Sequence, residues 1–120
     1  MVIKISRDQP VYLQIKAYIR DGVISGLYTP GDRIPTVREL AAQTNINPNT
    51  IQRAMAELEQ EQLLISHGTL GRFVTDNPAV IAAIKDDAVQ DAVRECLMRF
   101  HALGLSTQEA AALLTKQKEE

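Results

Sequence analysis

Apolar residues recur every three or four positions along the first half of the chain, a spacing typical of helices that bury one face. One such pattern runs from Pro10, which can occupy the first turn of a helix, to Gly26, which can end it. Two shorter patterns follow at 36–44 and 47–58, with a turn of about three residues between them. Two short helices joined so closely predict a helix-turn-helix.

Capping residues set the boundaries of these two short helices. Thr36 and Glu39 have the spacing of a capping box, in which a hydroxyl and a carboxylate each accept a free backbone N–H. Asn47 suits the N-cap of the second helix and Pro48 its first position, so this proline begins a helix instead of breaking one. The apolar positions expected to face the core from this helix are Ile51, Ala54, Met55 and Leu58.

A β-hairpin is expected directly after the second short helix. Residues 63–66 and 72–75 form two short runs of apolar and β-type residues, and 67–71 between them contain two glycines. A helix-turn-helix followed by a hairpin is a winged helix. The expected fold class is therefore mainly α with a small β-hairpin, in which 1–76 form a winged helix-turn-helix DNA-binding domain.

The remaining residues, 77–120, predict a two-helix dimerisation region. A long helix is expected over 78–103, followed by Gly104 as its stop and by a second capping box at Ser106 and Glu109. A winged helix of about 75 residues cannot cover the wide apolar stripe of so long a helix, which indicates a homodimer. The alternative is that the helix folds back on its own domain. The residues expected at the dimer interface are Ile81, Ile84, Val89, Val93, Leu97 and Phe100.

Composition limits the class of protein without identifying a partner. The chain has 120 residues, of which 45% are hydrophobic and 23% charged, values typical of a folded globular domain. The net charge of −2 does not indicate nucleic acid, although a slight basic excess lies in the N-terminal part. With Cys96 as the single cysteine, no intrachain disulfide is expected, which fits a cytoplasmic protein. Neither a signal peptide nor a membrane span is indicated.

Polar residues at the start of the second short helix are the candidates for DNA recognition. In a helix-turn-helix these residues enter the major groove, where Asn and Gln can bond adenine, Arg can bond guanine and a Thr methyl can contact thymine. A solvated helix face is the simpler alternative, but the turn before this helix and the hairpin after it favour DNA. The candidates are Pro48, Asn49, Thr50, Gln52 and Arg53 in the helix, Arg38 near the start of the preceding helix, and His67, Gly68 and Thr69 in the wing.

No catalytic or metal site is indicated. His67 and His101 are far apart in the sequence, and Cys96 with His101 does not make a zinc pattern. The glycine-rich phosphate loops and the nucleophile elbow of hydrolases are both missing from the sequence. We therefore expect a protein that is not an enzyme and that uses no cofactor and no metal.

Five blocks of residues carry a resemblance to a known family. They are P-V-Y-x-Q-I from Pro10, G-x-x-x-P-G-D-R-I-P from Gly26, R-E-L-A from Arg38, N-T-I through L-E from Asn49, and G-x-x-G-x-F-V from Gly68. In this order and spacing they resemble the GntR family of bacterial transcription regulators. That resemblance implies an N-terminal winged helix and a variable C-terminal domain. The short tail is similar to the YtrA-like branch, whose two tail helices serve for dimerisation.

The resemblance also implies which residues contact DNA. These are Arg38, Asn47, Pro48, Asn49, Thr50, Gln52, His67 and Gly68. Many relatives have arginine where this chain has Pro48, so more of the base readout is expected from Asn49, Gln52 and Arg53.

The sequence thus predicts a transcriptional regulator, by family habit a repressor, that binds an inverted-repeat operator as a homodimer. Two alternatives stay open. In the first, the protein is a sensor with a small-molecule effector of unknown identity at the dimer interface. In the second, it is a winged-helix module that binds another protein.

Overall fold

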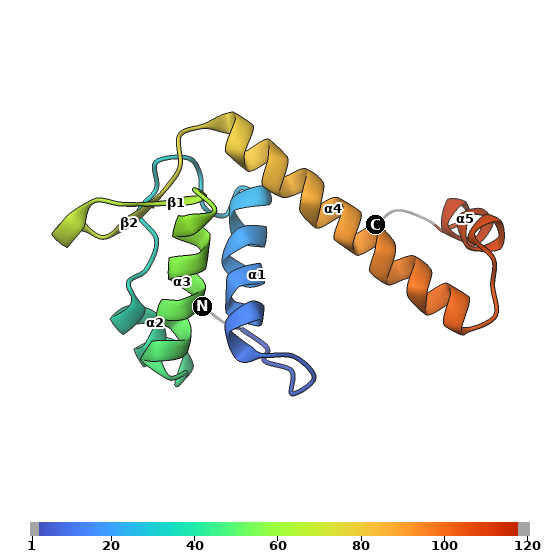
Figure 1. The fold of residues 1–120 in the computed structure, drawn as a ribbon, viewed down its shortest axis with the longest axis horizontal. Helices are drawn as coiled ribbons and strands as arrows, with labels where there is room; N and C mark the ends of the chain where they lie inside the picture. The colour runs from blue at the N-terminus through green and yellow to red at the C-terminus, as the bar shows by residue number, and fades with distance from the viewer. Residues whose placement is uncertain (1–2, 118–120) are drawn as a thin grey trace. The chain divides into compact units, whose positions relative to one another are not determined.

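The computed structural model describes residues 3–117 (Figure 1). The ends of the two predicted domains, 1–2 and 118–120, lie outside the described residues. The elements are α1 (Val11–Ile24), α2 (Val37–Thr44), α3 (Pro48–Gln60), β1 (Leu64–Ser66), the 3₁₀ turn η1 (Gly68–Leu70), β2 (Arg72–Val74), α4 (Pro78–Ala102) and α5 (Thr107–Thr115). They form two compact units, Met1–Ile84 and Lys85–Glu120, each described by itself below. The expected fold class, mainly α with a small hairpin, is confirmed.

The first helix, α1, begins directly after Pro10, which occupies the N-cap position. A proline here leaves no helical hydrogen bond unmade, because the first N–H groups of a helix have no partner within it. The helix ends two residues before Gly26, which adopts the left-handed φ of +88° that glycine tolerates. Ile15 and Ile19 face the interior and are only 1% and 2% exposed.

The helix-turn-helix of α2 and α3 is capped as the sequence predicts. The Thr36 hydroxyl accepts the N–H of Glu39 at 3.1 Å, and the Glu39 carboxylate accepts the N–H of Thr36 at 3.4 Å. Asn45 ends α2 in the left-handed conformation, with φ +58°. The side chain of Asn47 then accepts the N–H of Asn49 at 2.9 Å, and a proline takes the first position of α3. These local bonds fix the tight turn between the two helices.

The wing consists of β1 and β2, which pair antiparallel with Leu64 opposite Val74 and Ser66 opposite Arg72. Backbone hydrogen bonds of 2.8–3.0 Å also tie residues 31–34 to the other side of β2. The wing is therefore attached to the segment that leads into α2. Figure 1 shows the hairpin extending from one end of the winged-helix bundle, with α2 at the opposite end of α3.

The core of the first unit gathers around α3, against which α1, α2 and β1 pack. Ile51, Met55 and Leu58 are at most 1% exposed, which confirms that this side of α3 faces inward. Ile81 and Ile84, at the start of α4, are half-buried against the same core. These two residues, predicted at a dimer interface, thus have partners within their own unit.

The second unit contains the later part of α4 and all of α5. Gly104, at φ +88°, follows the end of α4, and Ser106 caps α5 through a second capping box with Glu109. Ala110 is the buried residue of α5. In contrast, no residue of α4 is fully buried in the described chain, and Val89 and Val93 are each 48% exposed.

Candidate nucleic-acid interface

Polar residues occupy the exposed face of α3. Because Ile51 and Met55 point into the core, Asn49 and Gln52 lie on the outer side and are exposed to solvent, and Thr50 is half-buried. Their amide and hydroxyl groups are of the kind that bond base edges in the major groove. Asn49 and Gln52, two of the predicted contact residues of this helix, thus lie one turn apart on its accessible side.

The first turn of α3 uses its backbone N–H groups internally. Pro48 has no N–H, the N–H of Asn49 bonds the Asn47 side chain, and the N–H of Thr50 bonds the Asn47 carbonyl at 3.0 Å. A helix start with free N–H groups is a ready site for a DNA phosphate, but here the cap already satisfies them. This end of α3 therefore offers a partner its side chains and not free backbone N–H groups.

Arg38, in the first turn of α2, has an exposed side chain. Among residues 3–117, no hydrogen bond or ion pair engages its guanidinium. Arg33 is instead paired with Glu39 at 3.5 Å. Hydrogen bonds from the backbone and the hydroxyl of Thr36, with a smaller contribution from Arg33, hold the pKa of Glu39 below its usual value. Arg38 is thus the arginine on this helix that is available to a phosphate.

The tip of the wing is small and polar on its exposed side. The His67 ring packs edge-on against Phe73, with ring centroids 5.0 Å apart, which fixes the start of the tip. Gly68 adopts φ +59° and is exposed together with Thr69. A concavity of about 230 Å³ separates the wing from the start of α2, and its lining includes Thr36 and Gly68. This surface can approach a nucleic-acid backbone closely.

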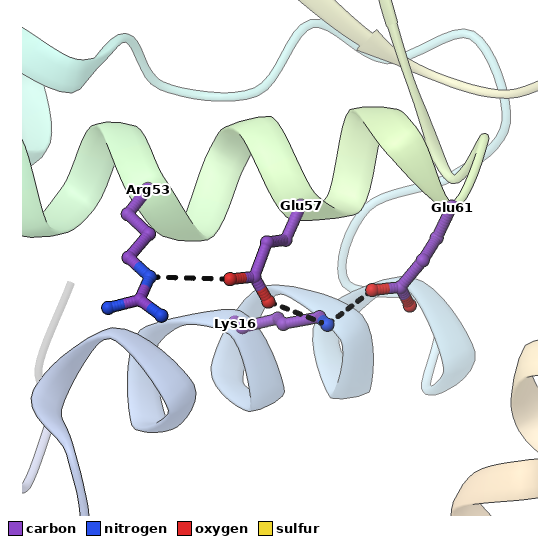
Figure 2. Close-up of polar contacts among 4 residues, drawn as sticks. All are labelled: Lys16, Arg53, Glu57 and Glu61. Atoms are coloured by element: carbon purple, nitrogen blue, oxygen red, sulfur yellow. Dashed lines mark hydrogen bonds and ion pairs between the residues drawn. The ribbon is translucent and has the colours of Figure 1, made fainter.

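Arg53 contacts α1 within the protein. Its guanidinium carbon lies 3.6 Å from the centroid of the Tyr12 ring, a cation–π contact. Its Nε also lies 3.4 Å from the Glu57 carboxylate, one turn further along α3 (Figure 2). The guanidinium predicted to read bases is therefore engaged by two residues of its own domain.

Lys16 of α1 extends this network along α3. Its ammonium lies 3.2 Å from the Glu57 carboxylate and also pairs with Glu61 (Figure 2). Burial by itself lowers the pKa of Lys16, but hydrogen bonds and charges from Glu61 and Glu57 outweigh it and raise the pKa. We call the set Tyr12, Lys16, Arg53, Glu57 and Glu61 the α1–α3 clamp.

Arg72 connects the wing to α3. Its Nε donates to the Glu59 carboxylate at 2.9 Å, and its Nη1 donates to the side-chain oxygen of Gln52 at 3.5 Å. The base of the wing therefore lies beside the exposed face of α3.

All predicted DNA-contact residues lie in the first unit, on α2, on α3 and its cap, and in the wing. No role at the DNA-contact surface was predicted for Tyr12, Lys16 or Arg72. One signal was available, because Arg53 and Glu57 have the i, i+4 spacing of a helical ion pair. The partners on α1 and β2 are distant in sequence and left no such signal.

Residues 3–117 contain neither a metal-binding cluster nor a membrane-spanning helix. No cluster of three or more His, Cys, Asp and Glu side chains there could hold a metal ion. Within the same residues, no helix combines the length and the apolar character that crossing a membrane requires.

A family model described as "Bacterial regulatory proteins, gntR family" matches residues 11–74, which is the winged helix. Among curated proteins, the chain is similar to the HTH-type transcriptional repressor YtrA of Bacillus subtilis. The two are 28% identical over 101 residues, which cover 83% of this chain and 78% of the repressor.

Solved structures show the same fold. A GntR family transcriptional regulator from Listeria monocytogenes is 30% identical, with a TM-score of 0.85 over 95% of this chain and 100% of that chain. The DNA-binding domain of AraR, solved in complex with operator ORX1, is 32% identical, with a TM-score of 0.55. This match covers 62% of this chain and 92% of the AraR chain.

Proposed function

The chain belongs to the GntR family of bacterial regulatory proteins, and from this premise we propose that it is a repressor that binds an inverted-repeat operator as a homodimer. The resemblance to the GntR family and its YtrA-like branch is confirmed. The protein is a DNA-binding transcription regulator and not an enzyme. The operator, the homodimer and repression are the proposed part.

The exposed polar face of α3 is the observation that carries operator binding. Asn49 and Gln52 lie outward beside the wing, and Arg38 is accessible on the neighbouring helix. The similarity to AraR, whose DNA-binding domain was solved with an operator, supports the same use of this surface. Repression is supported by the name of the related YtrA repressor.

Each part of this surface has a separate proposed role. Arg38 contacts a phosphate, whereas Asn49, Thr50 and Gln52 contact base edges in the major groove. Asn47 and Pro48 bring the helix start close to the duplex, and the wing tip, formed by His67, Gly68 and Thr69, approaches the neighbouring backbone or minor groove. Phosphate contacts make the affinity depend on salt.

Arg53 has a different proposed role. Its contact with Tyr12 holds α3 against α1, and the pairing with Glu57 fixes the guanidinium in that position, so Arg53 orients the recognition helix instead of reading a base. To reach the major groove, its guanidinium would have to give up both contacts.

Dimerisation is proposed through the second unit. Val89 and Val93 line a concavity of about 290 Å³ together with Ala92, Cys96 and Leu114, and this lining is almost wholly apolar. Exposure of such an apolar surface to water is unfavourable, so a second copy of the chain is the proposed partner that buries it. Because Ile81 and Ile84 pack on their own core, the residues proposed to carry the interface are Val89, Val93, Leu97 and Phe100.

Selection from a random duplex library by the full-length protein tests operator binding. At near-physiological salt, we expect an inverted repeat whose half-sites are read equally. Enrichment of a single half-site would contradict dimeric binding, and no enrichment at all would contradict operator binding.

Sedimentation of Val93→Asp tests the interface separately. We expect a monomer that still folds and binds an isolated half-site weakly. Met98→Asp is a matched control on the same helix, because Met98 is 71% exposed and lies outside the proposed interface. A dimer of unchanged stability in the Val93 variant would refute this interface.

A further inference from the structure

The contact between Arg72 and Gln52 joins a wing residue to a proposed base-reading residue. Arg72 reaches across from β2 and places its guanidinium along the exposed face of α3, between Gln52 and Glu59. These two α3 residues are two turns apart on the same side of the helix. Ala56 lies between them on that side, and its methyl group leaves room for the guanidinium.

The position of this guanidinium is fixed from both ends. The Arg72 backbone pairs with Ser66 of β1 and also accepts the N–H of Ile34 at 3.0 Å. At the other end, the ion pair with Glu59 at 2.9 Å holds the side chain, which is only 21% exposed. Arg72 is therefore a pre-positioned donor beside Gln52 before any DNA is bound.

The chemistry of arginine determines which way the Gln52 amide faces. A guanidinium has only hydrogen-bond donors, so the amide atom that faces it must be the oxygen and not the NH₂ group. The oxygen is thereby turned toward the wing, and the NH₂ group is left to face the groove. A free glutamine bonds adenine with both groups, donating to N7 and accepting from N6. Gln52 held in this way presents its NH₂ donors to the groove and turns its acceptor toward the wing.

We propose that Arg72 is a positioning residue that makes Gln52 read its base as a hydrogen-bond donor. The two acceptors of guanine, N7 and O6, fit such a reader, whereas adenine and cytosine each present an amino group that needs an acceptor. At the base that Gln52 faces, the protein therefore prefers guanine to adenine. This inference rests on the proposed operator binding.

The test compares base preferences of full-length variants in the same selection. In the parent, we expect guanine to exceed adenine roughly tenfold at one position of each half-site, a range that one good base contact supplies. Arg72→Ala should move that preference toward adenine by roughly tenfold, because the Gln52 oxygen is released. In the Gln52→Ala background, loss of Arg72 should leave the preference at that position unchanged.

Two further variants separate positioning from folding and from charge. Glu59→Gln loosens the anchor of Arg72 without altering the wing, and should shift the preference in the same direction by a smaller factor. Arg33→Ala removes a positive charge that does not contact Gln52, and should keep the parental preference. Melting temperatures of all variants show which of them fold.

The possible outcomes distinguish this inference from the proposed function. In one outcome, the Arg72→Ala or Glu59→Gln protein folds, loses affinity for all duplexes by the same factor and keeps the parental base preference. That outcome would overturn the positioning role alone. An equal shift in the absence of Gln52 would also overturn it. A parent that enriches no sequence would overturn operator binding and this inference with it.

Discussion

Replacing Arg53 by alanine should separate the stability of the winged helix from its sequence preference. The guanidinium packs on Tyr12 of α1 and pairs with Glu57 of α3, and Figure 2 shows the ion pair. Its loss therefore removes one link between α1 and α3 and one ion pair within α3. No base contact is removed if Arg53 only orients the helix. We therefore expect Arg53→Ala to lower stability and to leave the base preference of the protein unchanged.

The magnitude follows from the exposure of the two contacts. The Arg53 side chain is 61% exposed, so its cation–π contact should contribute about 0.5–1 kcal/mol. The ion pair with Glu57 has i, i+4 spacing along α3 and is exposed to solvent on its Arg53 side, so it should contribute about 0.3–0.5 kcal/mol. The free energy of unfolding should thus fall by roughly 1 kcal/mol, equivalent to a melting temperature lower by about 5 °C.

Urea denaturation followed by circular dichroism measures the stability, and duplex selection measures the preference. Gln60→Ala, an exposed position near the end of α3, is the stability control and should change neither quantity appreciably. Asn49→Ala should show the opposite pattern, with little loss of stability. The free-energy preference for one base at one position should fall by about 1–3 kcal/mol. An Arg53→Ala protein of parental stability with altered base preference would refute the stabilising role of the α1–α3 clamp. It would indicate instead that Arg53 contacts a base.

Three further predictions concern separate parts of the first unit. Arg38→Ala should weaken binding to all duplexes alike and reduce the slope of log affinity against log salt by about one, and a changed base preference would argue against a phosphate contact. Gly22→Ala should destabilise the protein by about 1–3 kcal/mol in urea, because the new Cβ would lie 2.9 Å from the Tyr28 ring, although helix propensity alone favours alanine by about 1 kcal/mol. The capping box lowers the pKa of Glu39 from an ordinary 4.5, so its stabilisation is present above that pH and is lost as pH falls through the lowered value. Glu39→Gln should therefore flatten the acid side of the stability curve, and an unchanged curve would count against this linkage.

The boundaries of the helices could be predicted because short-range chemistry sets them. Thr36, Asn47 and Ser106 each cap a helix with bonds to residues two or three positions away. Such bonds depend on residue type and spacing, both of which are visible in the sequence. The fold class followed from the order of these elements.

The partners of exposed and half-buried residues could not be predicted in the same way. The repeating apolar residues of α4 look alike in sequence, yet Ile81 and Ile84 pack on the winged-helix core and Val89 remains exposed. Likewise, Arg53 on α3 and Arg72 on β2 look like ordinary charged surface residues in the sequence, and only the tertiary structure brings them to α1 and Glu59. Periodicity reports which side of a helix is apolar, but not which neighbour covers it.

The pairing of β2 on both sides has a consequence for how the protein avoids aggregation through its strands. A strand edge with unpaired N–H and C=O groups is a template for another chain, and an exposed two-stranded hairpin would offer two such edges. Here residues 31–34 cover one side of β2, so within residues 3–117 only the short outer edge of β1 remains open. The wing can therefore present apolar residues such as Leu70, which is 69% exposed, without an extended edge on which β-aggregates could grow.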